Sequence, residues 1–141
     1  MKIKGIDHIA IVFGKCEDVL ILWEKILGLK FEHEEILEKN GVRVYVMRND
    51  GNEKEGPVIE MLEPYGENSP IINFLKKRGV GIHHICFKTD DIESDIRELK
   101  DKGVRLINEK PVEGANGSLI IFIEPKELGG ILVELKQEKI E

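Results

Sequence analysis

The length and composition of the chain suit one globular domain. It has 141 residues, of which 41% are hydrophobic and 34% are charged, and its formal net charge is −6. An acidic chain without a basic stripe is not typical of a nucleic-acid binder. No apolar stretch approaches the roughly 18 residues of a membrane span, and the N-terminus lacks the apolar core of a signal peptide. We therefore expect a single cytoplasmic domain, residues 1–141, with Cys16 and Cys86 reduced.

The predicted elements follow one order twice. In the first half a strand is followed by an amphipathic helix that ends at Gly28, and then by three more strands. A short linker helix with Ser69 as its N-cap comes next. The second half repeats the order, with Asp90 or Asp91 at the start of its helix and Gly103 at the end. The expected strands are 2–13, 31–37, 42–47 and 58–62, then 80–89, 104–108, 118–123 and 131–136, and the linker helix is 69–79.

Matching segments support this repeat. GIDHIAIVF, which begins at Gly5, aligns with GIHHICFKT, which begins at Gly81, and VIEML at residues 58–62 aligns with LVELK at residues 132–136. Both pairs recur at nearly the same offset, which indicates an internal duplication. We therefore predict an α+β fold of two tandem βαβββ modules, with halves of about 1–65 and 80–137. Their eight strands would form an open barrel with the helices on its outer face.

Four polar residues occupy repeat-related positions in otherwise apolar strands. His8 aligns with His84, and Glu60 aligns with Glu134. Because side chains alternate along a strand, each lies on a face with apolar neighbours. A buried carboxylate is costly unless it is paired or bound to a metal. If a two-fold axis relates the halves, two imidazoles and two carboxylates meet and suit a divalent transition metal. Cobalt is our first expectation, with manganese, nickel or zinc as alternatives.

Each of these four residues, taken alone, could also have a purely structural role instead of binding a metal. A single histidine or glutamate in a strand is more often a core, rim or solvated side chain than a ligand, and only the repeat favours a shared site. His83 lies beside His84, but alternation places it on the opposite face, and its repeat mate is Asp7. His33 stands among glutamates and is expected at the surface.

These residues and motifs resemble the vicinal oxygen chelate superfamily, which includes glyoxalase I. Within it the chain is most similar to the methylmalonyl-CoA epimerase family, over nearly its whole length. The motifs that carry the resemblance are IDHIAI, EMLEP followed by SPI..FL, GIHHICF, IFIEPKELGG and ILVEL. The resemblance implies a metal-dependent epimerase that moves a proton at C2 of an acyl-CoA. It also implies the ligand set His8, Glu60, His84 and Glu134.

The same resemblance suggests roles for further residues. Glu134 is our first candidate for a catalytic base and Glu60 the second, one for each face of a planar intermediate. Some family members carry a further carboxylate where this chain has Val44, and neither Arg43 nor Tyr45 is an obvious substitute. The CoA phosphates need cationic or backbone contacts, for which Lys126, Gly129-Gly130 and the loop 114–118 are candidates. Alternatively, each of these glycines only forms a turn and does not contact CoA.

Three other functions stay open. Glyoxalase I would use the same ligands on a glutathione hemithioacetal. A non-catalytic ligand-binding protein of the same fold generally needs no metal ligands, so the four residues argue against it. A ring-cleaving dioxygenase needs two histidines and one carboxylate on iron, so Glu60 and the short chain argue against that. We expect a homodimer with a small-molecule acyl-CoA substrate, and neither nucleic acid nor membrane as a partner.

Overall fold

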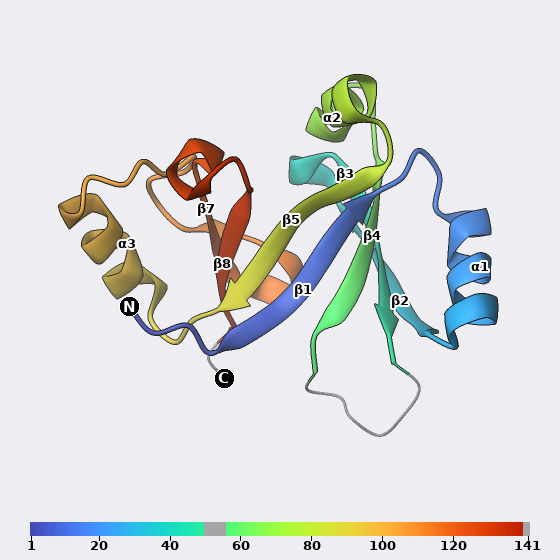
Figure 1. Ribbon diagram of the computed structural model, residues 1–141, viewed down its shortest axis with the longest axis horizontal. Helices are drawn as coiled ribbons and strands as arrows, with labels where there is room; N and C mark the ends of the chain where they lie inside the picture. Colours follow the sequence, from blue (N-terminus) through green and yellow to red (C-terminus); the bar gives the residue numbers. More distant parts are fainter. Residues whose placement is uncertain (50–55, 140–141) are drawn as a thin grey trace. The chain divides into compact units, whose positions relative to one another are not determined.

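Each predicted half opens with a strand, and both strands form. The computed structural model describes residues 1–49 and 56–139, and in it the two strands are β1 (Gly5–Val12) and β5 (Gly81–Lys88) (Figure 1). The chain divides into two compact units: unit 1 joins Met1–Asp7 to His84–Glu141, and unit 2 is His8–His83. The border between the units falls inside β1 and β5. Each unit therefore holds most of one predicted half, each opening strand is divided between the units, and unit 2 also contains the linker helix.

Unit 2 contains the first βαβββ module and the linker helix. Its strands have the order β2-β3-β4-β1, in which β1 runs parallel to β4 and the other neighbours are antiparallel. Gly41 ends the short 3₁₀ turn after residue 37 with a left-handed φ of 65°, which glycine adopts without steric cost. The remaining elements are α1 (Glu17–Leu27), β2 (Lys30–Leu37), the 3₁₀ turn η1 (Glu38–Asn40), β3 (Val42–Arg48), β4 (Val58–Pro64) and α2 (Pro70–Arg78).

The two faces of this sheet have different cores. One face is aliphatic and packs against α2, with Ala10, Val12, Val44, Val46, Leu62 and Ile71 buried together. The opposite face packs against α1 and buries Phe13, Cys16, Tyr45, Met47 and Met61 with Trp23 beside them. The alternation predicted for β1 is therefore confirmed. It gives His8 and Glu60 the same face as the aliphatic core.

Helix caps follow the predicted residues. Ser69 has extended backbone angles, and its hydroxyl accepts a hydrogen bond from the Ile71 N–H at 3.3 Å. At the start of the third helix, α3 (Ile92–Asp101), Asp91 is the N-cap, because its carboxylate accepts the Ser94 N–H at 3.1 Å. Each contact satisfies a backbone donor that a helix start would otherwise leave without a partner.

Unit 1 contains the second module. Its strands have the order β5-β8-β7-β6, with β5 parallel to β8, which repeats the parallel pairing of β1 with β4. Helix α3 packs on one face of β7 and β8 (Figure 1), where its Ile92, Ile96 and Leu99 meet Ile121, Ile123, Val133 and Leu135. The elements are α3 (Ile92–Asp101), β6 (Val112–Glu113), η2 (Ala115–Gly117), β7 (Leu119–Ile123), η3 (Pro125–Leu128) and β8 (Val133–Gln137).

The strand predicted at residues 104–108 is wrong. Only Leu106 forms a bridge there, to Ile123, and the edge strand is β6, later in the chain. The reason is Asn108, whose side chain takes the place of a backbone partner for β7. Its Oδ1 accepts the Phe122 N–H at 2.8 Å, and its Nδ2 donates to the Ile120 carbonyl at 3.2 Å. The module still reads β-α-β-β-β. Among the described residues, no helix has the length and apolar character needed to cross a membrane.

Candidate metal centre

Unit 2 holds the first histidine–carboxylate pair. In the parallel register of β1 and β4, His8 lies beside Val58 and Ala10 beside Glu60. Nδ1 of His8 is 3.3 Å from Oε2 of Glu60, and the two side chains are 4% and 13% exposed. An imidazole and a carboxylate therefore meet in a largely dry environment on the aliphatic face of this sheet.

Unit 1 holds the second pair at the repeat-related positions. Nε2 of His84 is 2.9 Å from Oε1 of Glu134, and the side chains are 7% and 8% exposed. The edge of the Phe122 ring contacts the His84 ring, with centroids 5.4 Å apart. Both ligand candidates lie on the sheet face opposite the core that α3 covers. Each predicted pair is thus brought together within its own unit.

The two pairs share a chemistry that favours a cation. A buried carboxylate needs a positive partner or strong hydrogen bonds to offset its lost hydration. A histidine next to it offers either a protonated ring or, when neutral, a nitrogen lone pair for a metal. A neutral imidazole and a carboxylate are both ordinary ligands of divalent transition metals. Each unit therefore presents two donors suited to such an ion.

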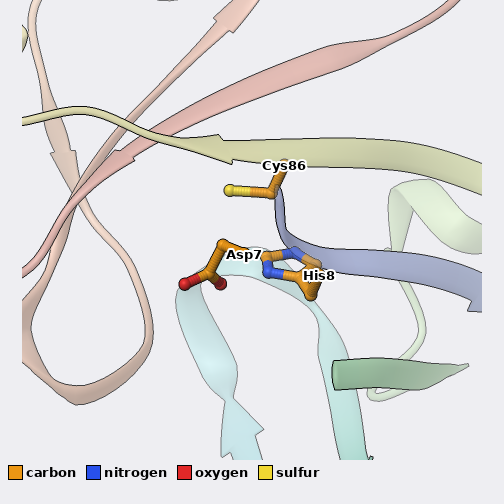
Figure 2. A group of neighbouring side chains, drawn as sticks. All are labelled: Asp7, His8 and Cys86. Carbon is orange, nitrogen blue, oxygen red and sulfur yellow. The ribbon is translucent and has the colours of Figure 1, made fainter. Parts of the chain in front are cut away.

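A buried ion pair that sequence analysis missed lies in unit 1. Nζ of Lys136 is 3.2 Å from Oδ2 of Asp7, with side chains 12% and 9% exposed. A carboxylate oxygen of Asp7 also lies within 4.8 Å of the Cys86 sulfur, and Cys86 is fully buried. Figure 2 shows Asp7 and Cys86, together with His8, the next residue of β1. The available signal was that Lys136 shares a strand face with Glu134.

The residues around Val44 offer no substitute for the carboxylate that some relatives carry. Val44 itself is buried among aliphatic side chains. Tyr45 belongs to the opposite face, where burial and its hydrogen bond to Glu63 raise the pKa of the phenol to about 12. Arg43 donates to Glu34 at 3.1 Å. A phenol with so high a pKa is a poor general base at neutral pH, so the expectation that neither neighbour replaces it stands.

Other predicted positions have structural roles. The His83 ring packs edge-on against Phe74, with centroids 5.0 Å apart. His33 is a half-exposed residue beside Glu32, as expected for a surface histidine. In loop 114–118, a Cβ added to Gly114 would lie 2.9 Å from Ile120, so close packing accounts for that glycine. Gly129 and Gly130 both have positive φ values. Contacts of these residues and of Lys126 with CoA remain predictions.

Comparison with known proteins bears on this arrangement. Residues 7–122 match the model of the Glyoxalase/Bleomycin resistance protein/Dioxygenase superfamily. The human mitochondrial methylmalonyl-CoA epimerase is 39% identical over 94% of this chain and 73% of its own length. The chain belongs to the methylmalonyl-CoA epimerase family of that superfamily. The resemblance seen in the sequence motifs is thereby confirmed.

Solved structures of the family agree with this assignment. The crystal structure of methylmalonyl-CoA epimerase from Mycobacterium tuberculosis has a TM-score of 0.90, at 33% identity, and covers 98% of this chain and 90% of its own. A variant of the Streptomyces coelicolor methylmalonyl-CoA epimerase, in complex with 2-nitronate-propionyl-CoA, has a TM-score of 0.89 at 33% identity, covering 99% and 100%. The predicted glyoxalase-like fold of tandem modules is confirmed.

Proposed function

We propose that the protein interconverts the (2R) and (2S) forms of methylmalonyl-CoA by moving the proton at C2. The observation that carries this proposal is the buried histidine–carboxylate pair in each unit, His8 with Glu60 and His84 with Glu134, at repeat-related positions. The family assignment supports the substrate, because the relatives named above are methylmalonyl-CoA epimerases.

We further propose that the four side chains hold one divalent metal ion. Two imidazoles and two carboxyl groups form a donor set typical of such ions. Cobalt is the first candidate, with manganese, nickel or zinc as alternatives. When bound, the ion would stabilise the negative charge that develops on the thioester oxygen as C2 loses its proton.

The protein's own part is to accept and return that proton. We propose that the carboxylate of Glu134 takes the C2 proton as the C–H bond breaks, and the bonding electrons move into the thioester carbonyl. Glu60, which carries a proton when the substrate binds, then gives that proton to C2 on the other face of the planar intermediate. The reverse reaction starts with Glu134 protonated and Glu60 as the base. The duplicated modules support one base for each face. The low exposure of both carboxylates favours proton transfer away from bulk water.

The proposal is tested by hydrogen exchange at C2. The cobalt-loaded protein is incubated with methylmalonyl-CoA in deuterated water, and the mass of the acyl group is followed against a metal-free control. Deuterium incorporation well above the control supports the epimerase. A lack of incorporation with cobalt confirmed bound contradicts it, and a parallel assay with methylglyoxal and glutathione then examines the glyoxalase I alternative.

We add proposals on the oligomeric state and the cellular location of the protein. We propose a homodimer, because exposed sheet edges of this fold tend to pair, and light scattering at several concentrations measures the mass. We also propose a cytoplasmic location, supported by two buried cysteines that are both free thiols. A monomer mass at all concentrations contradicts the first of these proposals.

A further inference from the structure

The buried pair of Asp7 and Lys136 raises a question about charge. Lys136 and Glu134 are two residues apart in β8, so their side chains share a face and their Cα atoms lie about 6.6 Å apart along the strand. A lysine has a flexible four-carbon stem with a mobile ammonium at its end. The ammonium of Lys136 is thus within reach of the carboxylate of Glu134.

A lysine that paired with Glu134 would oppose the proposed metal site. It would occupy a carboxylate oxygen that a cation needs, and it would repel that cation. The carboxylate with which Lys136 pairs instead therefore matters for the proposed site.

Asp7 is that partner. It lies 3.2 Å from Nζ of Lys136, whereas the carboxylate of Glu138 lies at 4.0 Å and is 69% exposed. Water screens the Glu138 contact. Asp7 is buried, so its attraction for the ammonium is screened less. The ammonium is consequently held toward Asp7.

We propose that Asp7 is a positioning residue that keeps the ammonium of Lys136 off Glu134, and so preserves the affinity of Glu134 for a cation. This inference rests on the proposed metal site. It concerns how Asp7 acts through Lys136, and it predicts that two substitutions in the same ion pair have opposite effects. Without Asp7, the ammonium of Lys136 can pair with the carboxylate of Glu134 and compete with a cation. Without Lys136, that competing ammonium is gone.

The test is a cobalt titration of four proteins: the wild type, Asp7→Asn, Lys136→Met and the double variant. Cobalt affinity is read from the visible absorption of the bound ion, which is independent of enzyme activity. Asp7→Asn should weaken cobalt binding by about 10-fold or more, a typical loss for a supporting residue near a metal. The double variant should return to within about 3-fold of the wild type, and Lys136→Met alone should bind at least as tightly as the wild type.

A matched control variant distinguishes an effect of Asp7 on the metal site from a general effect of losing a carboxylate. Asp90→Asn makes the same change in the exposed pair of Lys4 and Asp90, at 3.2 Å, and should leave cobalt affinity unchanged. If Asp7→Asn binds like the wild type, or if the double variant stays as weak as Asp7→Asn, the inference is overturned. If Asp7→Asn does not fold, Lys136→Met carries the test, and weaker binding overturns it. Failure of the wild type to bind cobalt would instead overturn the metal site itself.

Discussion

The two units carry the same pair of side chains in different surroundings. In unit 1 the pair is short, at 2.9 Å between His84 and Glu134, and in unit 2 it is 3.3 Å between His8 and Glu60. The contact atom also differs, because His84 uses Nε2 and His8 uses Nδ1. Duplication has therefore kept the residue types while the local geometry has changed.

The neighbours of each pair differ more than the pairs do. Asp7 and Lys136 form a buried ion pair in unit 1. By the same repeat alignment their counterparts are His83, which packs on Phe74, and Leu62, which lies in the aliphatic core. The repeat position that holds a lysine two residues after Glu134 therefore holds a leucine two residues after Glu60. The two glutamates therefore lie in different charge environments and are not equivalent, even if they bind one ion.

The largest expected effect comes from removing one histidine at a time. His84→Ala and His8→Ala should each weaken cobalt binding by more than about 100-fold, since losing a ligand costs more than the 10–100-fold typical of a supporting residue. Isothermal titration with cobalt measures both. If one variant keeps wild-type affinity, the histidine removed in that variant is not a ligand. A surface change, His33→Ala, is the matched control.

Truncation of each core should show how closely the units depend on one another for folding. Leu135→Ala in unit 1 and Met61→Ala in unit 2 each remove a side chain no more than 1% exposed and should cost about 2–5 kcal/mol of unfolding free energy. Because the border of the units falls inside β1 and β5, and not in a linker, we propose one folding domain. Urea unfolding should show one transition in both variants. Two separate transitions would mean that the units fold independently.

Alkaline pH should destabilise unit 2 through Cys16. Burial, with Glu63 beside it, raises the pKa of the Cys16 thiol from 9.0 to about 12. Above pH 9 the unfolded thiol loses its proton while the folded one keeps it, so stability is full below pH 9 and falls as the pH rises. The fall is at most about 1.4 kcal/mol per pH unit. Urea midpoints at pH 8, 9 and 10 measure it, and Cys16→Ala should flatten the trend. An unchanged slope in that variant contradicts the assignment.

The smallest effect is expected at the helix caps, one in each unit. Ser69→Ala and Asp91→Ala each remove a side-chain acceptor from a helix start and should cost about 1 kcal/mol. Thermal unfolding compares them with the wild type. Ser69→Asn and Asp91→Asn, which keep an acceptor, should recover most of the loss, and failure to recover would point to a role other than capping.

Much of the fold could be predicted because its signals are local or repeated. Alternation along β1 and the N-cap at Ser69 each depend on a few neighbouring residues. The prediction of a strand at residues 104–108 was wrong because the side chain of Asn108 accepts a hydrogen bond from β7. This contact joins distant positions of the chain, and strand periodicity does not encode it. Edge strands are short and weakly patterned, so such an error is most easily made there.

The candidate site was predictable only in part for a related reason. The four proposed ligands stood out because the chain repeats itself, so each polar residue in an apolar strand had a matching partner. Asp7 and Lys136 have no repeat of this kind, and they lie 129 positions apart in the chain. Their pairing depends on the tertiary arrangement of β1 and β8 within unit 1, which sequence spacing alone does not specify.

The central claim is that one metal ion is shared by the two histidine–carboxylate pairs. Anomalous diffraction from crystals of the cobalt-loaded protein tests it most directly. We expect one cobalt peak per chain, about 2.1 Å from a nitrogen or oxygen of each of His8, Glu60, His84 and Glu134. Two peaks, or one peak bound by a single pair, would contradict it.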